Sequence, residues 1–337
     1  MMEIPRPPAG GVWFVTGARG FVGRWLLRRL SQAGCEVLAV GRTPPEELPP
    51  GVSFVACDIT NAEAVSAAVA GRSIRYGVHL AAYVGDWGPR SEYEATNVAG
   101  TRHVLTALVE GGASCVIHIS SISVMGFHPA PDSDELVMPF GSGDAYSDTK
   151  AAGEQIAREL QQRGAPVVIL RPGDIHGIGS DPWVERPLKM MRSGQMMLVG
   201  GGQGHYGPVH VENLIDAIFL AVQVPSARGQ TYIITDGRND ITIGEWFRRL
   251  AQATGAPPPH RNMPAGVVSG VGLLLEGLAT VFGFKPPITR NAVRYITRTG
   301  GYSIDKARRE LGYSPRLSLE EALVEIGRYY GDSGSGR

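Results

Sequence analysis

Val12-Trp13-Phe14-Val15-Thr16-Gly17-Ala18-Arg19-Gly20-Phe21-Val22-Gly23 is the stretch that decides the fold. A strand-like run enters a loop with glycines at positions 17, 20 and 23, and an amphipathic run over residues 21–33 follows. Glycines at such a turn let the backbone approach a pyrophosphate, whose charge the helix N-terminus stabilises. The spacing is one residue wider at the front than in the common dinucleotide fingerprint, so an ordinary strand-to-helix turn is the alternative. The strand before the loop, the helix after it and a second strand at the expected distance favour a dinucleotide site.

Short apolar runs alternate with amphipathic ones through the first half of the chain. We expect strands at 12–16, 36–40, 52–57, 76–80, 115–119 and 167–170, and helices at 21–33, 62–70, 93–110 and 146–162. This alternation predicts an α/β fold, a doubly wound parallel Rossmann sheet with a smaller C-terminal substrate-binding lobe.

The predicted domain boundaries lie where the alternation of strands and helices begins and ends. We expect a flexible arm at 1–11, a dinucleotide-binding Rossmann domain at 12–171, a mainly substrate-binding lobe at 172–331 and a tail at 332–337. The lobe is expected to return to the Rossmann sheet near 205–235, and its helices are expected at 183–193, 211–222 and 243–254.

The composition limits the classes of function that the protein can have. The chain has 337 residues and 32 basic against 32 acidic side chains, so no basic excess points to nucleic acid. Cys35, Cys57 and Cys115 are far apart in apolar segments, which predicts neither disulfides nor a metal site. The proline-rich start has no apolar core typical of a secretion signal, so a soluble cytoplasmic enzyme is expected.

The end of the second strand bears on coenzyme choice. Where an acid would hold the ribose hydroxyls, the chain has Gly41-Arg42-Thr43, which favours NADP(H), with NAD(H) as the alternative. Arg42 and Arg19 are candidates to pair with the 2′-phosphate, or else are solvated surface residues. Asp58 is placed to accept a hydrogen bond from the adenine amino group, or belongs to the N-cap region of the next helix. Further cofactor contacts are expected from Phe21, Val22, Ile59, Ala81 and Ala82.

Tyr146 and Lys150 form the candidate proton relay. They stand four apart on a predicted helix and share one face. An ammonium near a phenol favours the phenolate and lowers its pKa from about 10. Ser121, at the end of the fifth strand, is placed to donate to a substrate oxygen, although Ser120 and Ser123 are close rivals. A chance pairing of tyrosine and lysine on a helix surface is the alternative.

With these residues in place, the chain resembles the extended short-chain dehydrogenase/reductases over nearly its whole length, and within them the 3β-hydroxysteroid dehydrogenase-like group. The more specific segments are Trp87-Gly88, Tyr93 with Asn97-Val98-Ala99-Gly100-Thr101, Leu170-Arg171-Pro172-Gly173-Asp174-Ile175-His176-Gly177, His210-Val211-Glu212-Asn213, Tyr232-Ile233-Ile234-Thr235-Asp236-Gly237, Tyr302-Ser303-Ile304-Asp305-Lys306-Ala307 and Leu311-Gly312-Tyr313-Ser314-Pro315. The resemblance implies that Ser121, Tyr146 and Lys150 are catalytic and that Asn97 supports the active-site helix. It also implies that Pro172, Gly173 and Ile175 pack near the nicotinamide.

Two positions depart from that group. His176 stands where the group usually has an aromatic such as tyrosine. Arg42 replaces the acid of the NAD-using members, so their coenzyme choice does not carry over. Trp87, Ser123, His176 and Trp183 are the expected substrate-pocket residues.

The segment 264–284 bears on the substrate. It is almost wholly apolar, contains one charge at Glu276 and is about long enough to span a bilayer. Its glycines, central acid and flanking prolines favour helices that close over a pocket, with a membrane-surface anchor as the less favoured alternative. Either interpretation suggests an apolar substrate.

The expected function is therefore an NADP(H)-preferring dehydrogenase/reductase that interconverts a secondary alcohol and a ketone on a hydrophobic, steroid-like or β-keto-acid-like substrate. A nucleotide-sugar epimerase or dehydratase is the first alternative, since Arg186, Lys189 and Arg192 are candidates to bind a diphosphate. A non-catalytic NADP(H)-binding redox sensor is the second. A homodimer through the two long helices beside the sheet is a further expectation.

Overall fold

A seven-stranded, all-parallel sheet forms the centre of the protein. The structure, a computed structural model, describes residues 4–331. The sheet order is β3-β2-β1-β4-β5-β6-β10. Its strands are β1 (Val12–Thr16), β2 (Val37–Gly41), β3 (Val52–Ala56), β4 (Ile74–His79), β5 (Cys115–Ile119), β6 (Val167–Pro172) and β10 (Thr231–Ile234). The predicted doubly wound Rossmann sheet is confirmed.

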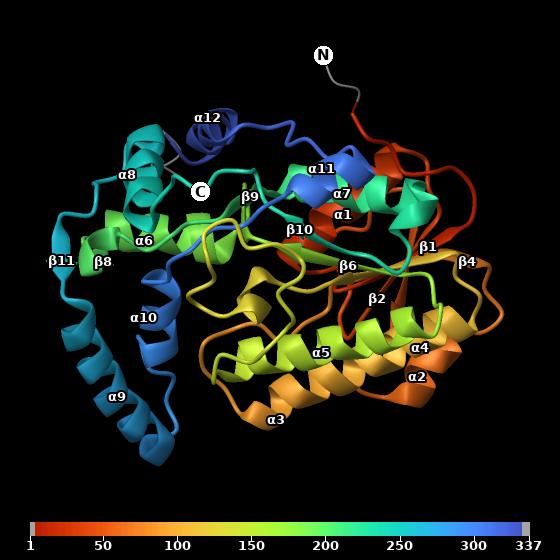
Figure 1. Ribbon diagram of the computed structural model, residues 1–337, viewed down its shortest axis with the longest axis horizontal. Coiled ribbons are helices and arrows are strands. Elements are labelled where there is room, and N and C mark those ends of the chain that lie inside the picture. Colours follow the sequence, from red (N-terminus) through yellow and green to blue (C-terminus); the bar gives the residue numbers. More distant parts are fainter. Residues whose placement is uncertain (1–3, 332–337) are drawn as a thin grey trace.

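Helices cover both faces of this sheet, as Figure 1 shows. One face carries α1 (Phe21–Gln32), α7 (Val211–Gln223) and α11 (Asp305–Leu311). The other carries α2 (Ala62–Val69), α4 (Thr101–Glu110) and α5 (Ala145–Gln162). Each layer packs leucine, isoleucine and valine side chains against fully buried strand residues, which accounts for the near-continuous apolar strand sequences.

The helix expected at 93–110 is in fact three segments. A short α3 (Arg90–Tyr93) leads into a π-helical stretch at Glu94–Gly100, and α4 follows. Apolar periodicity does not distinguish a π-helical stretch from an α-helix, because the change adds about one residue to a turn. Asn97 lies inside the π-helical stretch.

The second half of the chain builds a smaller lobe beside the sheet (Figure 1). Two small parallel pairs, β7 (Asp174–His176) with β9 (Pro208–His210) and β8 (Met197–Val199) with β11 (Arg261–Met263), join α6 (Arg186–Arg192), α8 (Ile243–Thr254) and α12 (Leu319–Tyr330). The aromatic core of this lobe centres on Trp246, Tyr206 and Trp183. Helices α9 (Ala265–Phe282) and α10 (Arg290–Ile296) extend from one side.

The described part of the N-terminal arm lies against the body. The Pro5 carbonyl accepts a hydrogen bond from Arg29 on α1 at 3.0 Å, and the Arg6 carbonyl accepts one from Gln223 on α7. The tail assigned to 332–337, and residues 1–3 of the arm, lie outside the described residues.

Candidate active site

The glycine loop fits a dinucleotide because its backbone is too crowded for side chains. Gly17 has a φ of +71°, and a Cβ on it would lie 2.7 Å from the Ala81 nitrogen. A Cβ on Gly23 would lie 2.3 Å from the Gly17 oxygen. No side chain caps the N-terminus of α1, so the first-turn N–H groups are open to an anion. These residues therefore fit the pyrophosphate of a nicotinamide dinucleotide.

Strand order places this loop at the switch point of the sheet. β1 pairs with β2 on one side and with β4 on the other, so the segments that follow these strands meet at one edge. The Ala81 N–H donates to Thr16 Oγ1 at 3.2 Å, which fixes the segment after β4 beside the loop. Phe21, Val22 and Ala82 are half-buried here, whereas the Ile59 side chain is buried in the core.

Arg42, Arg19 and Asp58 lie along the same edge with exposed side chains. The Cys57 N–H donates to the Gly41 carbonyl at 2.9 Å, so the ends of β2 and β3 stay together. Hydrogen bonds from Thr60 lower the pKa of Asp58, and the charge of Arg42 acts in the same direction. Asn61, not Asp58, provides the N-cap of α2 by accepting from the Ala64 N–H.

Ser121 and Tyr146 meet at the carboxyl end of β5. Ser121 Oγ accepts a hydrogen bond from the Ser123 N–H at 3.1 Å, which leaves its own O–H to donate. A hydrogen bond with Ser121 lowers the pKa of Tyr146, against a larger opposing effect of burial. Ser120 instead donates to Glu154 at 2.6 Å, and Ser123 is buried, so the geometry favours Ser121 among the three serines.

Lys150 lies on the same face of α5, but its ammonium does not lower the pKa of Tyr146 as expected. Its Nζ donates to the Ile119 carbonyl at 2.6 Å. Burial raises the pKa of Tyr146 to about 12 and lowers that of Lys150 to about 8, the latter against the charge of Glu154. Burial is therefore the largest influence on the pKa of Tyr146 in this arrangement, and the catalytic role of the pair stays a prediction.

Asn97 connects three parts of the site. Its Oδ1 accepts from the Tyr83 N–H at 2.8 Å, and its Nδ2 donates to the Tyr83 carbonyl and to Thr149 Oγ1, both at 3.1 Å. Thr149 belongs to α5, next to Lys150. The amide thus holds the segment after β4 against the helix that carries Tyr146.

Glu154 is a buried charged residue next to the relay that the sequence argument missed. Arg171 donates to it from Nη2 at 2.7 Å, and both side chains are fully buried. Burial raises the pKa of Glu154, but the hydrogen bond and charge of Arg171 outweigh this effect and keep the pKa below its usual value. The sequence contains a pattern that indicates this residue. Glu154 follows Lys150 by four residues, as Lys150 follows Tyr146, so the three side chains share one face of the helix.

The expected pocket residues divide into two groups. Among the pocket residues, Trp87 is half-buried and Ser123 is buried; of the residues expected near the nicotinamide, Gly173 and Ile175 are half-buried and Pro172 is buried. His176 is fully enclosed between Trp246 and Tyr206, and Trp183 packs on Tyr206 in the same core. In this structure His176 and Trp183 therefore contribute to the lobe's core.

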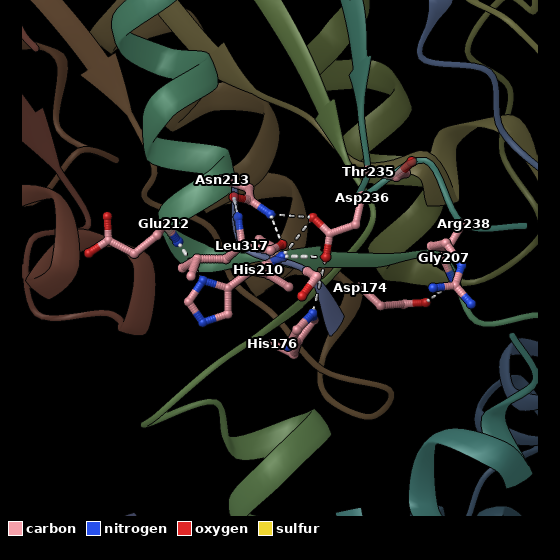
Figure 2. A network of polar contacts seen from close by, with 12 residues as sticks. Asp174, His176, Gly207, His210, Glu212, Asn213, Thr235, Asp236, Arg238 and Leu317 are labelled. Atoms are coloured by element: carbon pink, nitrogen blue, oxygen red, sulfur yellow. Dashed lines mark hydrogen bonds and ion pairs between the residues drawn. The ribbon is translucent and has the colours of Figure 1, made fainter. Parts of the chain in front are cut away.

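His176 also belongs to the polar network drawn in Figure 2. The Asp236 carboxylate contacts His176 Nε2 at 3.3 Å and accepts from the His210 N–H and from Asn213 Nδ2. Asn213 Nδ2 also donates to the Leu317 carbonyl at 2.9 Å. These contacts join β7, β9, the start of α7 and the C-terminal segment, so the network fixes the lobe to the sheet.

Comparisons with known proteins agree with this geometry. The model of the NAD dependent epimerase/dehydratase family matches residues 13–235. The 2-alkyl-3-oxoalkanoate reductase of Stenotrophomonas maltophilia is 32% identical over 323 residues, covering 93% of this chain and 97% of that protein. The 3-beta-hydroxysteroid dehydrogenase of Mycolicibacterium neoaurum is 31% identical over 336 residues, covering 94% and 91%.

Solved structures show the same fold. The protein MoeE5, in complex with UDP-glucose and NAD, superposes with a TM-score of 0.75 at 25% identity over 95% of this chain and 98% of its own. The UDP-glucose 4-epimerase of Thermotoga maritima has a TM-score of 0.78 at 21% identity, covering 95% and 98%. The second likeness is one of fold alone.

Proposed function

Because this chain belongs to the NAD-dependent epimerase/dehydratase family of extended short-chain dehydrogenase/reductases, we propose that it is an NADP(H)-preferring enzyme interconverting a secondary alcohol and a ketone on a hydrophobic substrate. One observation carries the proposal: Ser121, Tyr146 and Lys150 converge at the carboxyl edge of the sheet that also holds the glycine loop. The names of two relatives, an oxoalkanoate reductase and a hydroxysteroid dehydrogenase, support carbonyl and alcohol chemistry on apolar molecules.

The coenzyme, when bound, supplies or accepts the hydride. Gly17, Gly20 and Gly23 would hold its pyrophosphate, and Arg42 with Arg19 its 2′-phosphate. In the reducing direction Ser121 donates a hydrogen bond to the carbonyl oxygen, and Tyr146 donates the proton that this oxygen gains. With coenzyme and substrate bound, Lys150 would hold the nicotinamide ribose, and its charge would then favour the phenolate left on Tyr146. In the oxidising direction the Tyr146 phenolate accepts the proton of the alcohol, and Ser121 again hydrogen-bonds the substrate oxygen.

Coenzyme preference rests on charge at the end of β2. Arg42 and Arg19 are both exposed there, and among the described residues neither forms an ion pair with a carboxylate. A 2′-phosphate would give each guanidinium an anionic partner.

The epimerase alternative depends on a diphosphate-binding cluster, and the arginines named for it are engaged elsewhere. Arg186 donates to Asp181 at 2.5 Å, and Arg192 donates to the Tyr330 carbonyl at 2.5 Å. Lys189 lines a groove together with Glu185, whose carboxylate would oppose an anionic ligand. These contacts favour the hydrophobic-substrate proposal.

The decisive assay follows the oxidation of NADPH and NADH with steroid ketones, long-chain β-keto acids, aryl ketones and nucleotide sugars. We expect turnover on an apolar ketone with NADPH preferred. If no ketone causes coenzyme oxidation and the purified protein contains bound coenzyme, the result would support the epimerase instead. Firm NADPH binding without any turnover would support the redox sensor.

Replacing the proposed proton donor tests the relay. Tyr146→Phe removes the only oxygen of that side chain and should lower kcat by about 10²-fold to 10⁴-fold, the usual contribution of general acid catalysis. Coenzyme affinity, measured by fluorescence titration, should stay within about threefold, because the ring remains in place. Tyr76→Phe is the matched control, since this buried tyrosine lies on β4 and packs against Trp13 in the core. Full activity in Tyr146→Phe would exclude the relay.

A further inference from the structure

Helix α9 is an apolar helix with almost no cover. Of its 18 residues, only Val268, Gly272 and Ala279 are buried. Val268 packs with Val199 and Val293, and the backbone of residues 289–290 lies against Gly272. Figure 1 shows the helix projecting from the side of the lobe, with α10 between it and the rest of the protein.

The uncovered face is a continuous apolar stripe. Its members repeat at intervals of four and three, so they share one side of the helix: Val267, Val271, Leu274, Leu278 and Val281, exposed by 51%, 43%, 70%, 48% and 76%. Phe282, the last residue of α9, and Phe284, just past its end, add to this apolar surface with exposures of 73% and 39%. Contiguous exposed apolar surface of this kind marks an interaction site.

The stripe ends in the tip of a hairpin. Because the chain returns to Gly272 at residues 289–290, residues 273–288 form the protruding turn of the hairpin, which the Glu276–Arg290 pair holds to the start of α10. Leu273, Leu274, Leu278, Val281 and Phe282 therefore concentrate on the protruding part. These exposed side chains can enter an apolar phase while the Glu276–Arg290 pair keeps the turn attached to α10.

Charge around the hairpin is strongly one-sided, although the chain as a whole is neutral. Residues 257–299 contain one acid, Glu276, and five cationic side chains: Arg261, Lys285, Arg290, Arg294 and Arg298. Glu276 pairs with Arg290 at 2.7 Å, and buried Arg298 pairs with Asp174. Within residues 4–331, the exposed Arg261 and Lys285 form no ion pair with a carboxylate, whereas the Arg294 guanidinium lies over the Phe127 ring at 4.9 Å.

We propose that this hairpin, residues 261–294, docks on the surface of a bilayer that contains anionic lipid. The apolar stripe enters the region between headgroups and acyl chains, and the unpaired Arg261 and Lys285 contact lipid phosphates. The proposal concerns binding alone and does not depend on the reaction proposed above.

The hairpin lies on the membrane rather than crossing it, because both of its ends are fixed to the same body. β11, just before α9, pairs with β8 of the lobe. Beyond α9, Thr289 Oγ1 contacts Asp86 Oδ2 at 3.3 Å in the segment that follows β4. A spanning α9 would have to pull one of these attachments through the bilayer.

A second copy of the chain fits this surface less well. Symmetric pairing of two hairpins would bring Arg261 and Lys285 of both copies to one interface, where residues 257–299 offer no unpaired acid to balance them. Anionic lipid supplies the missing negative charge.

Vesicle co-sedimentation tests the proposal with the full chain. We expect binding to vesicles of phosphatidylcholine and phosphatidylglycerol, weaker binding to phosphatidylcholine alone, and release at high salt. The triple variant Leu274→Gln, Val281→Gln and Phe282→Gln should weaken binding at least about tenfold, since each exposed side chain contributes to burial in lipid. The double variant Arg261→Gln and Lys285→Gln should weaken binding to anionic vesicles by about thirtyfold and change binding to neutral vesicles little.

Val324→Gln, at a 53% exposed position on α12, is the matched control and should bind like the wild type. All substituted side chains are exposed, so thermal unfolding should be unchanged. Absence of wild-type binding, or equal binding to neutral and anionic vesicles, would overturn the proposal. If the wild type is a dimer that does not bind vesicles, and the triple variant is a monomer, the stripe would instead be the contact surface for a second copy of the chain.

Discussion

At the scale of single residues, burial determines the chemistry of the site more than charge pairing does. Tyr146 and Lys150 shift in opposite directions because burial penalises the charged form of each, the phenolate in one case and the ammonium in the other. The lysine nevertheless has its charge balanced by Glu154 one turn further along α5. A bound coenzyme and substrate must therefore complete the environment that makes the phenol acidic enough to react.

Arg42 provides a residue-scale prediction about coenzyme choice. Arg42→Asp should shift the ratio of kcat/KM values for NADPH and NADH toward NADH by about 10-fold to 100-fold. The reason is that one charge-assisted contact to the 2′-phosphate becomes a repulsion. Arg163→Asp, the same change at an exposed position after α5, is the control. An unchanged ratio in Arg42→Asp would remove this side chain from the phosphate site.

At the scale of elements, the glycine loop and α1 depend on one another. Gly23 lies in the first turn of α1, where its missing side chain lets the helix approach the Gly17 carbonyl. The π-helical stretch has a comparable role on the other face, because it directs Asn97 toward both Tyr83 and α5. In each case a local irregularity brings backbone segments close enough to shape the site.

Adding one methyl group tests the first of these contacts. Gly23→Ala places a Cβ about where the Gly17 oxygen stands, so we expect a loss of about 1–3 kcal/mol in the free energy of unfolding, together with weaker coenzyme binding. Gly270→Ala on α9 is the control. Its Cβ would meet nothing within 4 Å, so it should stabilise the protein by up to about 1 kcal/mol. Urea unfolding and coenzyme titration measure both effects, and equal stability of the two variants would contradict this account.

At the scale of the whole molecule, two buried histidines sit beneath the site. His79 on β4 contacts Thr16 at 2.8 Å and Thr101 at 3.1 Å, and its ring stacks on His118 of β5 at 5.7 Å. Burial, followed by the charge of Lys150, lowers the pKa of His79 to about 3 and that of His118 well below its usual value. Both rings are thus neutral wherever the protein is folded near neutral pH.

The lowered pKa values of these two histidines make the stability of the fold depend on pH. The unfolded chain binds protons below about pH 6.5, whereas the folded protein leaves His79 unprotonated down to about pH 3. More protons are bound in the unfolded state across this window, so stability falls as the pH falls. His118→Leu should reduce this slope between about pH 6 and pH 4 by up to about 1.4 kcal/mol per pH unit.

Leucine suits this position because neither ring nitrogen of His118 has a hydrogen-bond partner among the described residues. Urea unfolding at several pH values measures the slope, with His260→Leu at an exposed position as the control. A slope unchanged from the wild type would show that His118 is protonated in the folded protein.

The sequence by itself determined the sheet, the glycine loop and the placing of Tyr146 and Lys150 on one helix. Each of these depends on neighbours within a few turns of the chain: alternating apolar runs, glycines at a strand end and a spacing of four residues. The Rossmann order then brought Ser121 to the same edge, because successive parallel strands end together.

Only the tertiary structure decided the features that depend on distant residues. Lys150 donates to Ile119, Glu154 pairs with Arg171, and His176 is enclosed in the core of the lobe. No local sequence pattern predicts these contacts, because burial and charge balance arise when segments from different parts of the chain pack together. The same reason applies to α9, whose apolar sequence is compatible with a core helix, a lid or a surface anchor until its neighbours in space are known.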